Sequence, residues 1–434
     1  MSRGGLLAVL LGVVLAGGLT VAAISSPGGD VDTPSGLPEV GLDGGRSSVD
    51  VGSTLPNTPG DEPTDDAGAV APDGRLTLQP DGAPTPLVNT DDIQDGGPGP
   101  DGIPPIDEPH FTPADEVRFL AGREPVMTLT IGADTRAYPL QIMLWHEIVN
   151  DTVGDVPVSV TYCPLCNSAF VWERTVGDRV LSFGTSGKLY NSSLVAYDRQ
   201  TRSLWAHFTG EAIAGELTGT QLTARPSAIV SWDQFRAAHP EAPVLNRTTG
   251  AERDYGTSPY PGYDDVDEPP FLFEGETDDR LAAKERVVGV SRSDGTRNDG
   301  SAAVAVTFAR LEADRVVAFE VDGRSAVALY TPGTASALDT AEVRDGRDVG
   351  SVNVISPELD GVTYRFTADD DGRFVGRADD GRTVATIDVG GIVEPDGSTA
   401  PGGTQVAFET LPHVDTFWFA WAVFHPRTVL IGGS

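Results

Sequence analysis

The chain has 434 residues, and its 64 acidic against 30 basic side chains give it a formal net charge of −34. The phosphates of nucleic acid repel such a chain, so we exclude nucleic acid as a partner. Only Lys188 and Lys284 are lysines, and an acidic surface poor in lysine is typical of proteins that work in high salt, where carboxylate repulsion is screened. We therefore expect a halophilic protein, and its length allows two domains with cores of their own.

The N-terminal part predicts a location outside the cytoplasm. Residues 4–24 form an uninterrupted apolar run, which matches the ~20 residues that span a bilayer. We assign residues 1–26 to a signal peptide or a membrane anchor, and favour the anchor because no clear cleavage site follows. The protein would then be extracytoplasmic, either membrane-anchored through this segment or secreted.

Residues 27–110 are predicted to form a disordered linker rich in Gly, Pro and Asp. They contain 17 acidic residues but only two basic ones, Arg46 and Arg75, and show little periodicity. Such a segment buries too little apolar surface to offset the entropy lost on ordering.

Folded sequence begins near Phe111, and local signals predict its first helices and strands. Pro113 favours the first turn of a helix, Ser231 is a good N-cap, and Pro240 ends a helix. The expected elements are a short helix over 113–121, strands over 126–131 and 136–138, a helix over 139–145 that ends at His146, and a helix over 232–238.

Cys163 and Cys166 are the only cysteines of the chain. Apolar and alternating runs on either side of them predict a tight turn between two strands. Pro164 presets this turn, and Asn167 tolerates the left-handed conformation that closes it. Two thiolates that converge in such a turn form a metal knuckle, whereas a thioredoxin-type dithiol needs a helix directly after its first cysteine.

An internal repeat divides the folded part. Residues 162–170 align with 330–338, and the pattern Trp-x6-His-Pro begins at both Trp232 and Trp418. We predict a tandem duplication of two pseudo-symmetric, β-rich α+β copies. The first copy covers 111–250, a connecting segment 251–284, and the second copy 285–434.

The second copy lacks the sulfur atoms. Thr331 and Thr334 stand where the first copy has its cysteines, and Arg315 lies near the place of His146. Packing residues are needed in both copies, but a site can survive in one. Residues present only in the first copy are therefore the better site candidates.

Several motifs resemble the DUF3179 family, a family of domains of unknown function. They are HEIVND at 146–151, TYCPLCNS at 161–168, FGTSG at 183–187, YDRQTRSLW at 197–205, RDYG at 253–256 and PYPGY at 259–263. The resemblance extends from about Asp107 to the C-terminus and implies a secreted or membrane-anchored bacterial or archaeal protein, in a family without an established activity. His207 departs from it, because glutamine is usual there, so the resemblance does not make His207 a site residue.

The cysteine pair suits a transition metal, with copper ahead of zinc, because thiolates are soft ligands. A pair supplies only two ligands, and His146, at the end of a helix leading towards the pair, is our third. Glu147 and Asp151 are candidates to hold the metal ligands in place or to accept a proton from a metal-bound water. The alternative for a lone histidine is a hydrogen-bonded structural role.

A polar pocket for a small molecule is a further prediction. Its candidate residues are Asp198, Arg199, Arg253, Asp254, Tyr255, Tyr260 and Tyr263. Their alternative reading is a structural network of ion pairs and turns.

The leading hypothesis is thus a protein that binds copper or zinc at Cys163, Cys166 and His146. A thiol-disulfide oxidoreductase is one alternative, and it requires a helix after Cys166. A non-catalytic binding module with a structural disulfide is the other. No sequence feature fixes the oligomeric state or decides whether the protein is an enzyme.

Overall fold

The structure is a computed structural model, and it describes residues 76, 79–291, 303–369, 373–379, 383–387 and 408–433. The expected signal or anchor segment, residues 1–26, and the greater part of the linker lie outside the described residues. Within the described ranges, none of the helices has both the length and the hydropathy needed to cross a bilayer.

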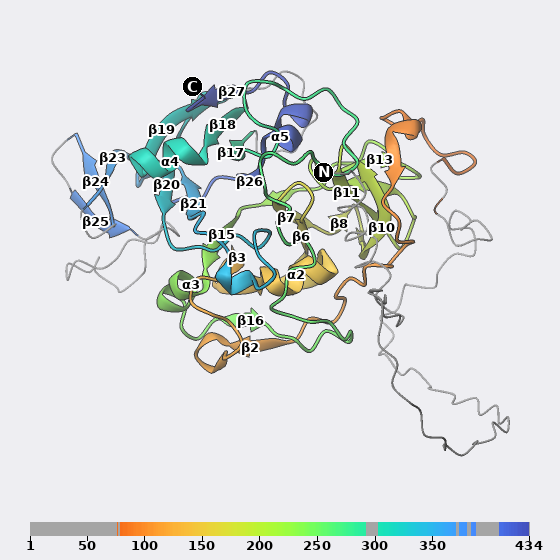
Figure 1. The fold of residues 1–434 in the computed structure, drawn as a ribbon, viewed down its shortest axis with the longest axis horizontal. Coiled ribbons are helices and arrows are strands. Elements are labelled where there is room, and N and C mark those ends of the chain that lie inside the picture. Colours follow the sequence, from red (N-terminus) through yellow and green to blue (C-terminus); the bar gives the residue numbers. More distant parts are fainter. Residues whose placement is uncertain are drawn as a thin grey trace, which may run out of the picture.

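Three sheets make up the first half of the β-rich α+β fold (Figure 1). The first has the strand order β15-β3-β4-β16-β2, and only β4 and β16 pair in parallel. Its elements are β2 (Phe111–Pro113), β3 (Pro125–Ile131), β4 (Asp134–Pro139), β15 (Ser227–Ser231) and β16 (Pro243–Leu245), with helices α2 (Leu140–His146) and α3 (Trp232–Ala238).

The second and third sheets hold the candidate site. The antiparallel order β14-β7-β6-β5 places the cysteine turn between β6 and β7, and the order β1-β10-β11-β12-β13 forms the third sheet. The strands are β1 (Ile93–Asp95), β5 (Ile148–Val153), β6 (Val156–Cys163), β7 (Ser168–Glu173), β10 (Phe183–Tyr190), β11 (Ser193–Asp198), β12 (Leu204–Ala206), β13 (Glu211–Ala214) and β14 (Ala224–Arg225), beside the small hairpin of β8 (Thr175–Val176) and β9 (Arg179–Val180).

The local signals predicted two of the three expected helices. Helix α2 ends at His146 as expected, and α3 has a capping box in which Ser231 and Gln234 bond each other's backbone N–H. The expected helix over 113–121 is wrong, because only a 3-10 turn, Ala114–Glu116, forms there. Pro113 provides no side-chain cap, and the chain returns to extended backbone at Val117.

The second half repeats this order of elements. Strands β17 (Arg286–Val290) and β18 (Val304–Thr307), helix α4 (Phe308–Asp314) and the three strands β19 (Val316–Val321), β20 (Arg324–Thr331) and β21 (Ser351–Ile355) follow one another as β3 to β7 do. Strands β26 (Val414–Phe417) and β27 (Val429–Ile431) flank helix α5 (Trp418–Phe424), and β27 pairs with β18 in parallel as β16 pairs with β4. The added elements are η3 (Val343–Asp345), β22 (Glu358–Leu359), β23 (Val362–Ala368), β24 (Phe374–Ala378) and β25 (Thr383–Ile387). The tandem duplication itself, with its copy boundaries, stays a prediction.

The two halves share one hydrophobic core. Strand β7 lies against β26, and β15 lies against β21, so strands of the two halves lie side by side (Figure 1). The largest core cluster contains Val160 and Cys166 of the first half together with Val287 and Trp418 of the second. The halves are therefore parts of one folded unit.

Residues 79–110 differ from the predicted disordered linker. They include the 3-10 turn η1 (Thr90–Asp92) and strand β1, which pairs with β10. Ile93 and Ile106 are buried, and Ile106 forms a β-bridge with Val149. Isolated apolar anchors of this kind leave no periodic pattern, which explains why the segment resembled a linker.

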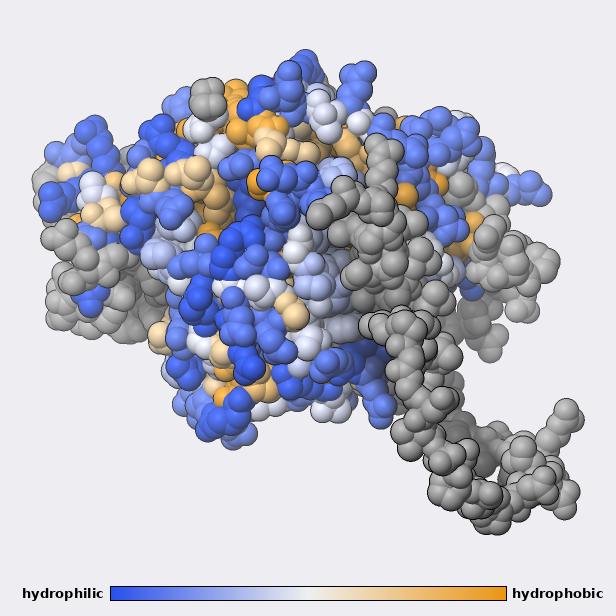
Figure 2. All heavy atoms as spheres, in the orientation of Figure 1, coloured by the Kyte–Doolittle hydropathy of each residue, from blue (hydrophilic) through white to orange (hydrophobic). Residues whose placement is uncertain are grey.

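The outer surface is mostly hydrophilic, as the high content of acidic residues predicts. Hydrophilic residues cover most of the face in Figure 2, and apolar residues form scattered patches between them. Among the described residues, the large apolar side chains that are exposed are Val180, Val266 and Val429. Most large apolar side chains of the described residues are therefore at least partly buried.

Candidate metal centre

The cysteine turn has the predicted geometry. Cys163 ends β6 and is paired with Ser168 at the start of β7, so the intervening residues form a tight turn. Asn167 closes it with a φ of 48°, a left-handed value that Asn adopts more readily than most residues. The side chain of Asn167 accepts a hydrogen bond of 3.0 Å from the hydroxyl of Tyr162, which fixes the turn from β6.

A cluster of three potential metal ligands surrounds this turn. The ligand atoms of Cys163, Cys166 and His207 all lie within 4.8 Å of one another, and all three residues are buried. Metal–ligand bonds of about 2.0–2.3 Å place neighbouring ligand atoms roughly 3.5–4 Å apart, so a small contraction would close the cluster around an ion. We call these three residues the Cys2His cluster, and it is compatible with metal binding.

Polar groups contact both sulfur atoms. The backbone N–H of Leu194, in β11, donates to Cys163 Sγ at 3.4 Å, and Cys166 Sγ lies 2.9 Å from the hydroxyl oxygen of Ser168. Burial raises the pKa of the Cys163 thiol. Burial also disfavours the Cys166 thiolate, but hydrogen bonds from Cys163, Ser168 and Ser193 outweigh it and lower the pKa of Cys166.

His207 follows β12 directly and is the member of the cluster that the sequence did not predict. Its Nδ1 lies 3.5 Å from the Ser168 hydroxyl, and its buried Nε2 has no hydrogen-bond partner among the described residues. Burial lowers the pKa of His207 to about 4, so the imidazole is neutral at pH 7, as a ligand must be. No local pattern marks it, since β-pairing alone brings β12 to the turn.

His146, the predicted third ligand, is not part of the cluster. Its Nδ1 lies 2.6 Å from the carbonyl oxygen of Pro104, and its Nε2 lies 2.6 Å from the Tyr255 hydroxyl. A carbonyl can only accept, so Nδ1 carries the proton and Nε2 accepts from Tyr255. Both nitrogens are thus engaged, and His146 has the structural role that was the alternative for it.

Glu147 lies near the cluster, but its chemistry differs from the prediction. It is buried at the end of α2, with a φ of 60°. Burial is the larger cause that raises the pKa of Glu147 well above its usual value, and electrostatic repulsion by Cys163 is the smaller one. Burial therefore favours the protonated form of this side chain, which weighs against the predicted role of proton acceptor.

Asp151 is engaged in a structural network. Its carboxylate accepts hydrogen bonds from Arg136 at 2.8 and 2.9 Å and from the Tyr138 hydroxyl at 2.6 Å. It shares Arg136 with Asp134. These contacts join β4 to β5, and none of them connects Asp151 to the Cys2His cluster as predicted.

The first residues of the predicted polar pocket belong to turns of the third sheet. Asp198 is fully buried and accepts from Trp205 Nε1 at 2.9 Å, while Arg199 forms ion pairs with Asp101 and Asp107. Burial raises the pKa of Asp198 despite these hydrogen bonds. This is the structural network that we named as the alternative.

Arg253, Asp254 and Tyr255 lie in the connecting segment. Arg253 and Asp254 are exposed, and Tyr255 contacts His146 and Thr249 through its hydroxyl. The two contacts of Tyr255 connect it to α2 and to the segment after β16. None of these contacts joins them to Asp198 or Arg199.

Tyr260 and Tyr263 complete the predicted set. The Tyr263 hydroxyl donates to the carbonyl of Leu165, inside the cysteine turn, at 3.0 Å, and its ring lies 6.5 Å from that of Tyr260. Burial raises the pKa of both tyrosines. Tyr263 thus contacts the turn directly and Tyr260 packs near it, and the seven predicted residues do not converge on one pocket.

The second half holds the turn from the opposite side. Thr416 Oγ1 and the backbone N–H of Phe417 donate to the carbonyl oxygen of Cys166 at 2.7 and 3.1 Å. In the second half, Thr334, which aligns with Cys166, contacts the hydroxyl of Ser351 at the start of β21. A contact between two hydroxyls therefore stands where the first half has the contact between Cys166 and Ser168.

The fold and the cluster define a β-rich α+β protein with a buried Cys2His group at a strand turn. The chain belongs to the family described as "Protein of unknown function (DUF3179)", whose match covers residues 100–428 and confirms the resemblance of the motifs. Neither a curated protein nor a solved structure matches the chain.

Proposed function

We propose that the protein binds a transition-metal ion at Cys163, Cys166 and His207, with Cu(I) preferred over Zn(II). The observation that carries this proposal is the approach of three buried ligand atoms to within 4.8 Å of one another. Thiolate and neutral imidazole are soft or intermediate donors, which is the chemistry that Cu(I) and Zn(II) select. We assign binding to this site and no reaction.

The number of ligands favours copper. No fourth His, Cys, Asp or Glu joins the group among the described residues. Structural Zn(II) almost always takes four protein ligands, and catalytic Zn(II) keeps a water in the fourth position. Burial of all three residues leaves little room for such a water, whereas Cu(I) accepts three soft ligands.

The charge of a copper site needs support from the protein. Two thiolates around Cu(I) leave one negative charge, which is costly to bury without hydrogen bonds. The Leu194 N–H and the hydroxyls of Ser168 and Ser193 lie against the sulfur atoms and supply that support. Burial favours the neutral form of Glu147, which adds no further negative charge.

The paired loss of both sulfurs also supports a joint role. We infer that the halves derive from one duplicated ancestor, because strand order and helix positions recur in both. In the second half Thr331 and Thr334 replace both cysteines together. If two residues bind one ion, the loss of binding removes the need for both of them. Residues kept for packing alone would instead be replaced independently.

The structure weighs against the thiol-disulfide alternative. Strand β7 begins at Ser168, so no helix follows Cys166 to activate a thiolate. Both cysteines are buried and free, and exchange requires an exposed sulfur. The binding-module alternative, with a structural disulfide, predicts that the two thiols are oxidised in the purified protein.

Metal analysis of the reduced, purified protein tests the proposal. We expect about one copper per chain after incubation with Cu(I) and removal of weakly bound ion. Cys163→Ser and Cys166→Ser should each lose most of it, because one soft ligand is replaced by a hydroxyl. Thr334→Ser, at the position of the second half that aligns with Cys166, is the matched control and should bind as the wild type does.

Equal and near-zero copper and zinc in all four proteins would contradict the proposal. A wild type that binds one zinc and excludes copper would keep the site but reverse the preference. A titration of free thiols on the same samples reveals a disulfide, which would favour the binding module.

We also propose that the protein lies outside the cytoplasm, tethered or released through residues 1–26. The apolar run of residues 4–24 supports this placement. Fractionation of cells that produce the full chain tests it. Recovery of the whole protein in the cytosol would contradict it.

A further inference from the structure

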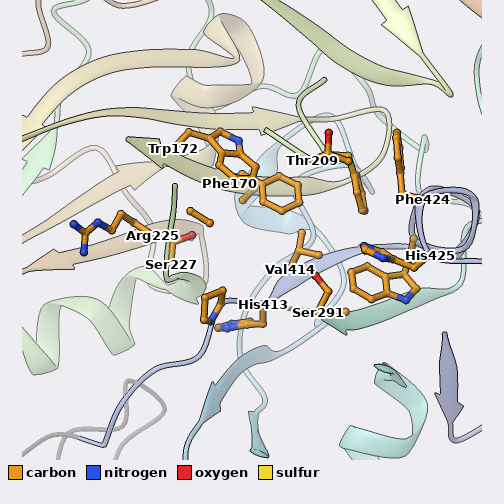
Figure 3. Close-up of a pocket in the computed structure, with 16 residues that line it drawn as sticks. Phe170, Trp172, Thr209, Arg225, Ser227, Ser291, His413, Val414, Phe424 and His425 are labelled. Atoms are coloured by element: carbon orange, nitrogen blue, oxygen red, sulfur yellow. The ribbon is translucent and has the colours of Figure 1, made fainter. Parts of the chain in front are cut away.

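Two hollows of the molecule differ in the chemistry of their walls. The hollow where the two halves meet contains a wall of aromatic rings, including those of Phe170, Trp172 and Phe424 (Figure 3). The other is an open depression of about 480 Å³ beside β2 and β16, and most of the side chains that line it are polar or charged. Residues 246–248, with the sequence Asn-Arg-Thr, form part of this polar wall.

The sequence Asn-Arg-Thr is one of three motifs of the form Asn-x-Ser/Thr in the chain, at residues 150–152, 191–193 and 246–248. This motif is the acceptor for N-linked glycosylation, in which a sugar chain is attached to the amide nitrogen of the asparagine. An acceptor motif must lie on the surface of the folded protein, because the attached sugar chain is bulky and hydrophilic. The surroundings of the three motifs therefore decide which of them can be modified.

Burial closes the first two motifs. Asn150 is buried, and its Nδ2 donates to Asp107 and to the carbonyl of Phe183, both at 2.7 Å, so both amide hydrogens are used. In the motif at 191–193 the hydroxyl belongs to Ser193, which is buried and lies 3.6 Å from Cys166 Sγ. That hydroxyl is part of the acceptor signal, and an enzyme cannot reach it in the folded protein.

The third motif is accessible and keeps an amide hydrogen for substitution. Asn246 is half-buried, and Arg247 and Thr248 are exposed. Asn246 Nδ2 donates to Thr112 Oγ1, in the edge strand β2, at 3.1 Å, and this bond uses one of its two hydrogens. Asn246 Oδ1 accepts the backbone N–H of Thr248 at 2.9 Å, which holds the motif in an Asx turn. Substitution of the second amide hydrogen would keep both bonds.

We propose that Asn246 carries an N-linked oligosaccharide that occupies the depression and extends into solvent. Glu116 and Arg118 also line the depression, and their charged groups can bond sugar hydroxyls. In the transfer, Nδ2 bonds to the anomeric carbon of a lipid-phosphate-linked oligosaccharide. The bond from that carbon to the phosphate oxygen breaks, the lipid phosphate leaves with the electron pair, and Nδ2 gives one proton to the transferase. The proposal rests on the extracytoplasmic location proposed above, where such donors are used.

Peptide mass spectrometry of the full-length protein, purified from the cells in which it naturally occurs, tests the proposal. We expect the peptide with Asn246 to exceed its bare mass by a set of sugar residues, and Asn150 and Asn191 to be unmodified. Thr248→Ala removes the hydroxyl of the motif but keeps the backbone N–H that bonds Asn246, so it should lose the added mass. Thr248→Ser is the matched control, because it keeps the hydroxyl, and it should retain the added mass.

Three results would overturn the proposal. The first is an unmodified Asn246 in the wild-type protein. The second is modification of Asn150 or Asn191 to the same extent as Asn246, because burial would then not select the site. The third is added mass on Asn246 in Thr248→Ala, because the motif would then not be the acceptor signal. The wild-type measurement decides even if a variant fails to fold.

The same samples show which of the proposals fails. Unmodified protein in the cytosol contradicts the proposed location, whereas unmodified protein outside the cytoplasm contradicts only the glycosylation. Copper binding by Thr248→Ala should equal that of the wild type, because none of the residues 246–248 belongs to the Cys2His cluster. The metal site and the modified asparagine are therefore tested independently.

Discussion

Two buried histidines of the first half differ in how many of their ring nitrogens are engaged. His146 uses both, towards Pro104 and Tyr255, whereas Nε2 of His207 has no partner among the described residues. The sequence favoured His146 because it lies at the end of a helix beside acidic residues. Such neighbours say nothing about where the ring points, and the contacts favour His207.

Exchange of each histidine separates the two assignments. His207→Gln should lower the affinity for Cu(I) at least ~10-fold, because an amide is a poor ligand for a soft ion. His146→Gln should leave that affinity unchanged, although it removes two hydrogen bonds. Competition with a Cu(I) chelator measures both. The reverse order of effects would restore His146 as the ligand.

Asp151 and Asp134 bind the same guanidinium in different surroundings, so they form a matched pair. The Asp151 side chain is 6% exposed and that of Asp134 is 27% exposed. Asp151→Asn should lower the free energy of unfolding by about 3–5 kcal/mol, since it leaves Arg136 and Tyr138 poorly compensated in the interior. Asp134→Asn should cost less than about 1 kcal/mol. Urea unfolding measures both, and equal losses would mean that burial does not set the difference.

At the level of elements, the cysteine turn was the most predictable part of the molecule. Pro164, Asn167 and the alternating strands around them are local signals, and the structure has the turn and both strands as predicted. His207 could not be predicted in this way, because β12 reaches the turn only through the pairing of the third sheet. Residues 79–110 were missed for a related reason, since single buried side chains anchor them.

The turn also makes a backbone prediction. Asn167→Ala should destabilise the protein by about 1–2 kcal/mol more than Asn167→Gly, because alanine resists a φ of 48° and glycine does not. Both variants lose the hydrogen bond from Tyr162, so that loss cancels in the comparison. Thermal unfolding of the two variants measures the difference, and equal stability would argue against the left-handed turn.

For the whole molecule, buried histidines make stability depend on pH. Burial lowers the pKa of His146 and of His425 from 6.5 to about 4. Between these values the unfolded chain binds protons that the folded chain does not. The stabilisation is therefore complete above pH 6.5 and is lost as the pH falls towards 4.

His146→Gln isolates one of these contributions. Between pH 6.5 and 4.5 the unfolding free energy of the variant should fall less steeply than that of wild type, by up to about 1.4 kcal/mol per pH unit. Above pH 7 the two slopes should agree, which serves as the internal control. Chemical unfolding at several pH values measures them, and parallel curves throughout would exclude the shift of His146.

The core that both halves share has a consequence for how the protein can change. Val287 and Trp418 lie in the same cluster as Cys166, so a fragment that ends at residue 250 would open the sulfur-bearing turn to water. The half without cysteines cannot be removed, because its side chains cover the cysteine turn of the first half. Mutations in the second half can replace its own cysteines, but they must keep the apolar side chains that cover the thiols of the first half.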